Sequence, residues 1–185
     1  MNNAIMFIVG TLFDVVCFLF LARLILQASR ADFYNPISQG VVKATDPVLK
    51  PLRLVIPGWK NFDASALLSA WLVKILALAI LSALGSGFLP PVPQLLAVAL
   101  FEVLRLLLSV YFFAIIIVVV LSFIAPGGYH PVAALMYQVT EPVMAPARRI
   151  IPPLGGLDFS PILVIMVIVL LRDHVLPAML GAIFA

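Results

Sequence analysis

The sequence predicts an all-α membrane protein whose four transmembrane helices form two repeats in parallel orientation, each built as helix, interfacial segment and helix. Three observations predict this fold: the composition, four long apolar stretches, and one motif that occurs twice. Of the 185 residues, 64% are hydrophobic and 10% are charged, whereas a soluble domain is about half apolar and about a quarter charged. Since each span takes about 20 residues, the chain has room for about four to six spans and no separate soluble domain.

Four apolar stretches are candidate spans, and they cover residues 5–26, 64–84, 95–124 and 160–182. The third is long enough to tilt, or to hold a short interfacial helix at 95–101 before a span at 102–124. The first is too long for a signal-peptide core and lacks an Ala-x-Ala exit, so we expect it to remain as a helix. The single cysteine, Cys17, lies in this stretch, which excludes a disulfide within the chain and argues against a thiolate metal site.

The charges of the connecting segments predict the direction of the spans. Lys and Arg residues occur in segments 27–63 and 125–159, whereas the turn at 85–94 contains none. Because basic residues near span ends stay in the cytoplasm, we expect both basic segments on the cytoplasmic side of a bacterial inner membrane and both termini outside. The net charge of +3 then follows the topology, so it does not indicate binding of nucleic acid.

One motif occurs twice in the chain, at a constant separation of 95 residues. The matching pairs are Asn35-Pro36 with His130-Pro131, Thr45-Asp46-Pro47 with Thr140-Glu141-Pro142, Pro51 and Arg53 with Pro146 and Arg148, Ile56-Pro57 with Ile151-Pro152, and Asp63-x-Ser65 with Asp158-x-Ser160. The motif divides the chain into a first repeat, 1–90, and a second, 95–185. Because each repeat crosses twice, the two share one orientation and are related by an axis along the membrane normal.

The residue types of the motif predict short helices at the membrane surface. Asn35 followed by Pro36 is a typical helix start, and Pro47 should end that helix and let Asp46 cap a second one. Short helices with apolar and basic sides lie among headgroups and bind anionic lipid. The predicted caps are Asn35, Asp46, Glu141, Asp63, Asp158 and Ser160. The side chains predicted to face lipid or a partner are Lys50, Arg53, Arg148 and Arg149.

These motifs resemble the YggT family, also called YlmG-like, of small bacterial and plastid membrane proteins. The resemblance covers nearly the whole chain. It rests on Asp32-Phe33-Tyr34-Asn35-Pro36 through Asp63-x-Ser65, and on His130-Pro131 through Gly155-Gly156-Leu157-Asp158-Phe159-Ser160-Pro161. The second copy departs from the first at His130 and Glu141. The resemblance implies roles linked to osmotic or ionic stress tolerance, to cell division and nucleoid distribution and, in plastids, to cytochrome maturation. It implies no catalytic residues.

Several charged residues fall inside the predicted spans, where each needs a partner or a purpose. Asp14 and Lys74 lie at similar depths and should form an ion pair. The other predicted pairs are Glu102 with Arg172 and Arg105 with Asp173. Such pairs either fix helix packing or form a path for ions or protons. At the inner end of the first span, we expect Arg23 and Arg30 to extend to lipid phosphates.

The sequence contains no spacing typical of nucleotide binding, nucleophilic hydrolysis or zinc chemistry, so we expect no enzyme, no cofactor and no metal site. Our leading hypothesis is a non-enzymatic inner-membrane scaffold or assembly factor with a protein partner in the membrane. The alternative is a small ion channel or ion-transport accessory that acts as a homo-oligomer. Small residues spaced for close helix contact could serve such self-association, namely Ala66, Ala70, Ala79 and Ala83.

Overall fold

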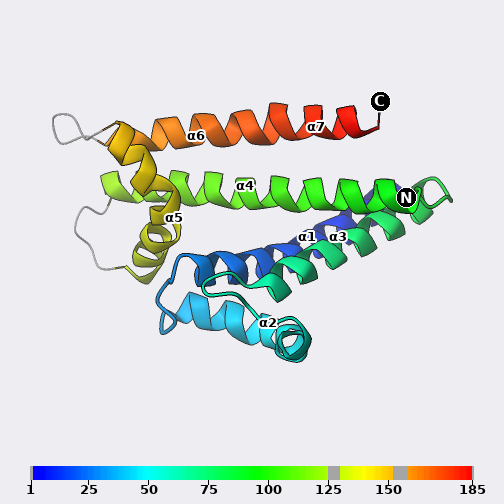
Figure 1. Ribbon diagram of the computed structural model, residues 1–185, viewed down its shortest axis with the longest axis horizontal. Coiled ribbons are helices and arrows are strands. Elements are labelled where there is room, and N and C mark those ends of the chain that lie inside the picture. Colours follow the sequence, from blue (N-terminus) through cyan, green and yellow to red (C-terminus); the bar gives the residue numbers. More distant parts are fainter. Residues whose placement is uncertain (1, 125–129, 152–157, 185) are drawn as a thin grey trace.

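The computed structural model describes residues 2–124, 130–151 and 158–184, and these residues form a bundle of helices (Figure 1). The elements are α1 (Asn2–Ala28), α2 (Pro36–Val55), α3 (Ala64–Gly85), α4 (Val92–Ile124), α5 (Pro131–Ile150), α6 (Ser160–Leu170), the π-helical segment η1 (Leu171–Val175) and α7 (Leu176–Ile183). Four stretches are long and apolar enough to cross a membrane: Asn3–Ala28, Ala64–Gly85, Val92–Ile124 and Ser160–Ile183. The predicted all-α class with four candidate spans is confirmed.

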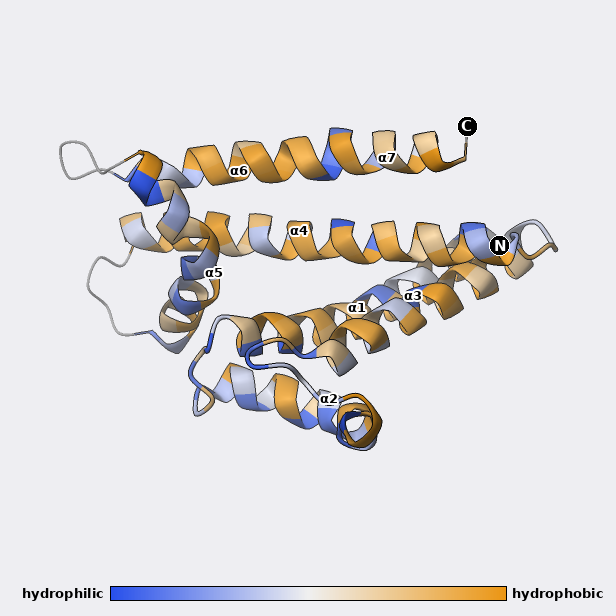
Figure 2. Cartoon of the chain, in the orientation of Figure 1, coloured by the Kyte–Doolittle hydropathy of each residue, from blue (hydrophilic) through white to orange (hydrophobic). Residues whose placement is uncertain are grey.

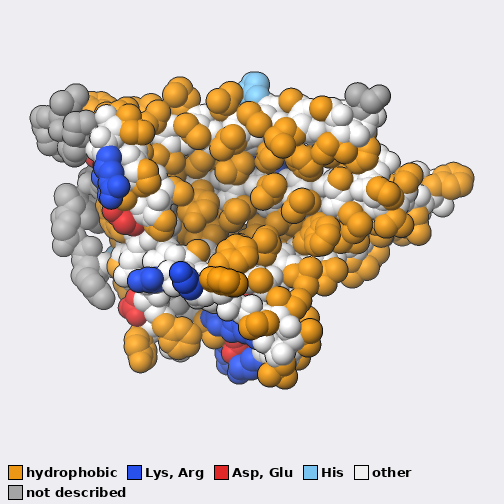
Figure 3. Space-filling view, viewed as in Figure 1, with side chains coloured by type: hydrophobic (Ala, Val, Ile, Leu, Met, Phe, Trp, Pro, Cys, Tyr) orange, Lys and Arg blue, Asp and Glu red, His pale blue; other side chains and the backbone are white. Residues whose placement is uncertain are grey.

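The four long helices run up and down between two ends of the molecule. Figure 1 shows α5 across the left ends of α4 and α6, α2 below the bundle near the end of α1, and both chain termini towards the right. Figure 2 shows mainly hydrophobic residues along the long helices, with hydrophilic ones concentrated in α2, α5 and the neighbouring connections. On the face drawn in Figure 3, Lys, Arg, Asp and Glu side chains likewise gather at the α2 and α5 end. The molecule therefore has an apolar body with one polar end.

The predicted offset of 95 residues is visible in the backbone, because α2 begins at Pro36 and α5 at Pro131. Each helix starts with a side chain that accepts a hydrogen bond from the backbone. Asn35 Oδ1 accepts from Ile37 N at 2.9 Å, and His130 Nδ1 accepts from Val132 N at 3.3 Å. Such N-caps satisfy amides that have no partner within the helix.

The prediction that proline divides each short segment into two helices is wrong. Pro47 lies inside α2 and Pro142 inside α5, and both helices continue past them. A proline removes one backbone hydrogen bond and bends a helix, which the remaining bonds can still hold together. Figure 1 shows the bend, since the last part of α2 is seen end-on. Asp46 and Glu141 are consequently interior helix residues, and their predicted roles as caps are also wrong.

A threonine two residues before the first internal proline has the same contacts in both helices. Thr45 Oγ1 donates to Val41 O at 2.8 Å, and Thr140 Oγ1 donates to Met136 O at 2.8 Å. A threonine hydroxyl bonded to the preceding turn favours a bend in a helix. The two helices therefore contain the same two features that favour a bend, an internal proline and this threonine.

Of the two alternatives for the third span, the interfacial helix at 95–101 is not formed, because α4 is one continuous helix. The predicted end of the second segment at Pro152 and the motif residues 155–157 lie outside the described residues.

The tightest packing joins α1 to α3. Ala66 and Ala70 are fully buried in one core cluster with Cys17 and Leu21 of α1, and the Cys17 thiol lies 3.7 Å from Ala70 O. Small side chains let two helices approach closely. Ala66 and Ala70, expected at a contact between copies, therefore serve the fold of a single chain.

The two repeats also contact each other. Within the bundle, α4 packs against both α3 and α1. At the polar end, Asn35 Nδ2 donates to Pro131 O at 2.7 Å, and Asp32 N donates to Gln138 Oε1 at 2.7 Å. The start of α2 is thus tied to the first turns of α5.

Candidate functional site

The corner between α2 and α3 is held by a buried carboxylate. Arg53 forms an ion pair with Asp63, whose side chain is fully buried. Asp63 Oδ1 also accepts from Ser65 Oγ at 2.9 Å and from Ala66 N at 3.2 Å. Burial opposes ionisation, but the hydrogen bonds from Arg53, Ser65 and Ala66 outweigh it and hold the pKa of the Asp63 carboxyl below its ordinary value. The ion pair of Arg53 and Asp63 therefore joins the end of α2 to the start of α3. This pair and its equivalent in the second repeat, Arg148 with Asp158, are here called the staples.

The corner between α5 and α6 repeats this arrangement with more exposure. Arg148 Nε donates to Asp158 Oδ2 at 3.0 Å, and its Nη1 donates to Glu141 Oε2 at 2.7 Å. Asp158 Oδ1 accepts from Ser160 N at 2.9 Å. Burial opposes the charge, but hydrogen bonds from Ser160 and Arg148 lower the pKa of the Asp158 carboxyl. The two carboxylates likewise raise the pKa of Arg148 against its burial.

Ser160, predicted as a cap, is the first residue of α6 and is completely buried. The helix start is stabilised by Asp158, which accepts from the Ser160 amide. Asp63 similarly serves as the N-cap of α3.

These staples change which basic residues can meet a partner. Arg53 and Arg148 are partly buried and engaged within the chain. The Lys50 side chain is 73% exposed although its Nζ lies 3.0 Å from Asp46 Oδ2. Arg149 is exposed and has no ion-pair partner among the described residues. Of the four side chains predicted to face lipid or a partner, Lys50 and Arg149 are the exposed ones.

A second group of charges lies within the spans. Lys74, on α3, is almost completely buried, and its Nζ lies 2.7 Å from Asp14 Oδ1. The same Nζ lies 3.9 Å from Glu102 Oε2 on α4. Glu102 is also 3.9 Å from Arg105, one turn further along α4. Asp14, Lys74, Glu102 and Arg105, here called the charge row, therefore connect α1, α3 and α4.

The expected crosswise pairs of Glu102 with Arg172 and of Arg105 with Asp173 are not formed. Arg172 instead makes two hydrogen bonds of 2.8 Å to the neighbouring Asp173, and its guanidinium lies over the Phe112 ring, 5.2 Å from the centroid. Both residues belong to the π-helical segment η1, whose wider turn changes side-chain directions relative to an α-helix. Glu102 is meanwhile drawn to Lys74 and Arg105.

All these charges lie at a similar level along the bundle. The charge row and the Arg172–Asp173 pair lie about 15–20 Å from the helix ends opposite α2 and α5, by the rise of an α-helix. Figure 2 shows the hydrophilic stretches of α4 and of the α6–α7 helix at matching positions along the long axis. The charges therefore form a band across the bundle, near the middle of an apolar layer about 30 Å thick.

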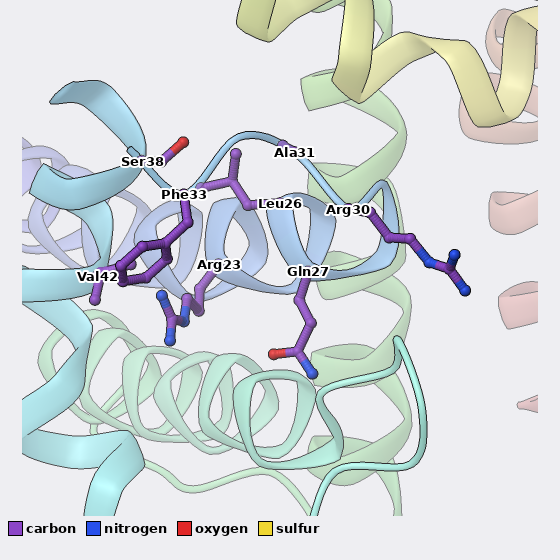
Figure 4. A pocket seen from close by; sticks show the side chains of 8 residues that line it. All are labelled: Arg23, Leu26, Gln27, Arg30, Ala31, Phe33, Ser38 and Val42. Carbon is purple, nitrogen blue, oxygen red and sulfur yellow. The ribbon is translucent and has the colours of Figure 1, made fainter. Parts of the chain in front are cut away.

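A polar cleft lies where α1 ends and α2 begins (Figure 4). Its volume is about 350 Å³. It is lined by Arg23, Leu26, Gln27, Arg30, Ala31, Phe33, Ser38 and Val42. Arg23, which was expected to extend to lipid phosphates, has a side chain only 13% exposed, so it lies within the cleft and not on the open surface. The cleft was not predicted from the sequence. A comparison of the repeats could have indicated it, because Arg23 and Gln27 of the first repeat correspond to Val118 and Ser122 of the second.

In the ranges 2–124, 130–151 and 158–184, no group of three or more His, Cys, Asp and Glu residues is placed to hold a metal ion.

The fold and the paired staples define a class: a tandem-repeat membrane protein in which each half is a span, a bent surface helix and a second span. Residues 2–84 and 97–179 each match the CCB3/YggT family, and the chain belongs to this family. Both ends of the second match are displaced by 95 residues from those of the first, which is the offset of the sequence motif.

Related proteins occur in several bacteria. A Pseudomonas aeruginosa protein, named as uncharacterized, is 44% identical over 163 residues, which cover 88% of this chain and 83% of the relative. An uncharacterized Vibrio alginolyticus protein is 39% identical over 159 residues, covering 85% of each chain. The Escherichia coli protein named uncharacterized protein YggT is 31% identical over 166 residues, covering 90% of this chain and 86% of the relative. No solved structure matches the chain.

Proposed function

We propose that the protein is a non-enzymatic scaffold or assembly factor of the bacterial inner membrane, which binds a protein partner within the bilayer and at its cytoplasmic surface. The basic segments around α2 and α5 support a cytoplasmic position for this end. Family members' links to osmotic stress tolerance, cell division and complex maturation are compatible with such an accessory role.

The observation that carries the proposal is the exposure of the charge row. Lys74 is enclosed, but the Asp14 and Arg105 side chains are each 55% exposed on the helix surfaces. A charged side chain near the middle of a membrane costs about 2.5–3.5 kcal/mol on insertion scales. Contact with another polypeptide would remove these charges from lipid, so the row favours a helix docked beside α1 or α4.

The ends of the surface helices offer a second contact region. Near exposed Lys50, the large side chains Leu54 and Trp59 are 87% and 76% exposed. In the second repeat, exposed Ile150 follows Arg149. Basic and apolar groups together favour an amphipathic helix that rests among lipid headgroups or binds a partner there.

A crosslinking experiment tests the proposal. A photoreactive residue at Thr11, which is exposed and one turn from Asp14, should crosslink a partner in cells. Replacing both Asp14 and Arg105 by Leu keeps the spans insertable but removes the exposed charges, so this crosslink should be lost. A probe at exposed Met179 of α7, away from the charge row, serves as the control. Unchanged crosslinking from Thr11 in the double variant would refute a partner held by these charges.

The alternative function, an ion channel or ion-transport accessory acting as an oligomer, is motivated by the same charges. Their arrangement favours it less, because they lie at one level across the bundle, whereas a path through the membrane needs polar groups at successive depths. Ion flux through liposomes distinguishes the two functions. The path predicts altered flux for Asp14→Asn at equal protein content, and the scaffold predicts none.

A further inference from the structure

The guanidinium of Arg23 is nearly enclosed yet poorly satisfied. Its Nε is buried without a hydrogen-bond partner. Its Nη2 lies 3.8 Å from Asp46 Oδ1, which is too long for a hydrogen bond. A guanidinium carries five N–H donors, and leaving a buried donor of a charged group without an acceptor is costly. The Arg23 guanidinium therefore needs a hydrogen-bond acceptor in addition to the protein groups described.

The nearby carboxylates are engaged by other cations. Asp46 Oδ2 is 3.0 Å from Lys50 Nζ, much closer than Asp46 comes to Arg23. Asp63 is paired with Arg53 and bound by Ser65 and the Ala66 amide. With Lys50 and Arg53 counted, the cations around Asp46 and Asp63 outnumber the two carboxylates by one. The cleft therefore favours an anion.

Two polar side chains of the cleft extend from the same side of α1. Figure 4 shows Arg23 and Gln27, one turn apart, extending from α1 in the same direction, whereas Arg30 extends away from them. With the Asn61 amide oriented so that its oxygen faces Arg30, that oxygen accepts from Arg30 Nε at 2.7 Å and from Nη2 at 3.1 Å. Arg30 is therefore satisfied outside the cleft, while Arg23 and Gln27 remain available.

We propose that the cleft is a phosphate-binding site in which the Arg23 guanidinium and the Gln27 side-chain amide hold the phosphate oxygens. Arginine suits this task because its planar fork matches the geometry of phosphate. Arg23 lies about 8 Å from the end of α1, close to the level of headgroup phosphates. The phosphate can belong to a lipid headgroup or to free inorganic phosphate.

The second repeat indicates that the fold does not need these polar groups. The positions equivalent to Arg23, Gln27 and Ser38 are Val118, Ser122 and Ala133. The second repeat nevertheless forms its own bent surface helix and staple. Polar residues retained in one copy beyond the needs of its fold are the pattern of a binding site.

The test uses the full-length chain, purified in a neutral detergent, freed of lipid and titrated with phosphatidylglycerol or with sodium phosphate alone. Native mass spectrometry counts bound lipid, and the unfolding temperature reports binding of either probe. The variants are Arg23→Gln and Gln27→Glu, the latter placing a competing carboxylate beside Arg23. The matched control is Arg30→Gln, which removes one positive charge from the same helix end but leaves Arg23 and Gln27 in place, because the Arg30 guanidinium is directed to Asn61.

We expect wild type to bind one phosphatidylglycerol molecule, and Arg23→Gln and Gln27→Glu to bind it about tenfold more weakly or less, as expected for loss of a charged hydrogen bond. Arg30→Gln should weaken binding by no more than about threefold. Stabilisation by phosphatidylglycerol but not by sodium phosphate identifies a lipid headgroup, and stabilisation by both identifies the phosphate group itself. If Arg23→Gln does not fold, Gln27→Glu decides alone.

The proposal is overturned if wild type binds neither probe, if Gln27→Glu binds phosphatidylglycerol as wild type does, or if Arg30→Gln loses binding as completely as the cleft variants. The last result would show a general attraction between a basic surface and an anionic lipid.

Discussion

The two repeats share a backbone plan but differ in how their spans pack. In the first, α1 and α3 are in contact along much of their length, and in the second α4 and α6 contact each other less. The contact face of α3 near its start is made of small residues, Ser65, Ala66, Ser69 and Ala70. The equivalent residues of α6 are Ser160, Pro161, Val164 and Ile165. Larger side chains keep helices apart, so packing diverged while the helix order stayed the same.

The looser packing of the second repeat leaves space. A mainly apolar cavity of about 480 Å³ lies between α4, α5 and α6, with Tyr111, Val143 and Val164 among its lining residues. The staple shows the same difference in enclosure, since Asp63 is fully buried and the Asp158 side chain is 34% exposed. The same motif therefore contributes differently to the stability of the two repeats.

The largest expected effect separates the two staples. Asp63→Ala leaves the partly buried Arg53 without its partner, and should lower the free energy of unfolding by about 3–5 kcal/mol. Asp158→Ala removes a more exposed partner, and Arg148 keeps Glu141, so the loss should be about 1 kcal/mol or less. Denaturant titration in detergent measures both, and equal losses would contradict the difference in burial.

Acid should destabilise the protein through the same carboxylates. Because the folded-state pKa values of Asp63 and Asp158 lie below their ordinary value, their stabilisation is fully present above it and is lost as the pH falls through the folded values. The unfolding temperature should therefore drop below about pH 4. Asp63→Asn should flatten this dependence more than Asp158→Asn, and an equal response of both variants would count against the distinction.

Added volume should harm one repeat and not the other. Ala70→Leu forces a large side chain between α1 and α3 and should cost about 1–3 kcal/mol, as overpacking does. Val164→Leu extends a side chain into the cavity of the second repeat and should be neutral or stabilising. Unfolding temperatures of the two variants in one detergent give the comparison. A loss for Val164→Leu as large as that for Ala70→Leu would show that the cavity is not accessible space.

The smallest expected difference is at the helix starts. Asn35→Ala removes an N-cap and the bond from Asn35 Nδ2 to Pro131 O, and should cost about 1–2 kcal/mol. His130→Ala removes only a longer hydrogen bond to Val132 N, and should cost about 0.5 kcal/mol. Thermal unfolding of the single variants measures both, with a larger loss for His130→Ala as the contradicting result.

The sequence was sufficient to predict the features that depend on local chemistry. Apolar length located the spans, and the doubled Asn35-Pro36 motif located the starts of the surface helices. The prediction that Pro47 ends a helix was wrong, because the strength of the remaining hydrogen bonds in α2 decides whether a proline bends or ends a helix. The staples could have been recognised, since an arginine lies ten residues before an aspartate in both repeats.

Contacts between distant helices were harder to predict. The Asp14–Lys74 pair followed from depth alone, but the contact of Lys74 with Glu102 depends on α4 packing against α3. The Arg172–Asp173 pair depends on the π-helical turn of η1, which no residue pattern indicated. The Arg23 cleft arises from the crossing of α1 and α2, and a linear sequence does not specify that crossing.

Each repeat crosses the apolar layer twice, so the chain returns to the side from which it started before the second repeat begins. A gene segment encoding such a hairpin can be copied in tandem, and the new copy will insert in the same direction without reversal of its flanking charges. When two hairpins together form one bundle, the two copies can differ in residues that only one of them needs. The small residues of α3 and Arg23, which occur in the first repeat and not in the second, agree with that freedom.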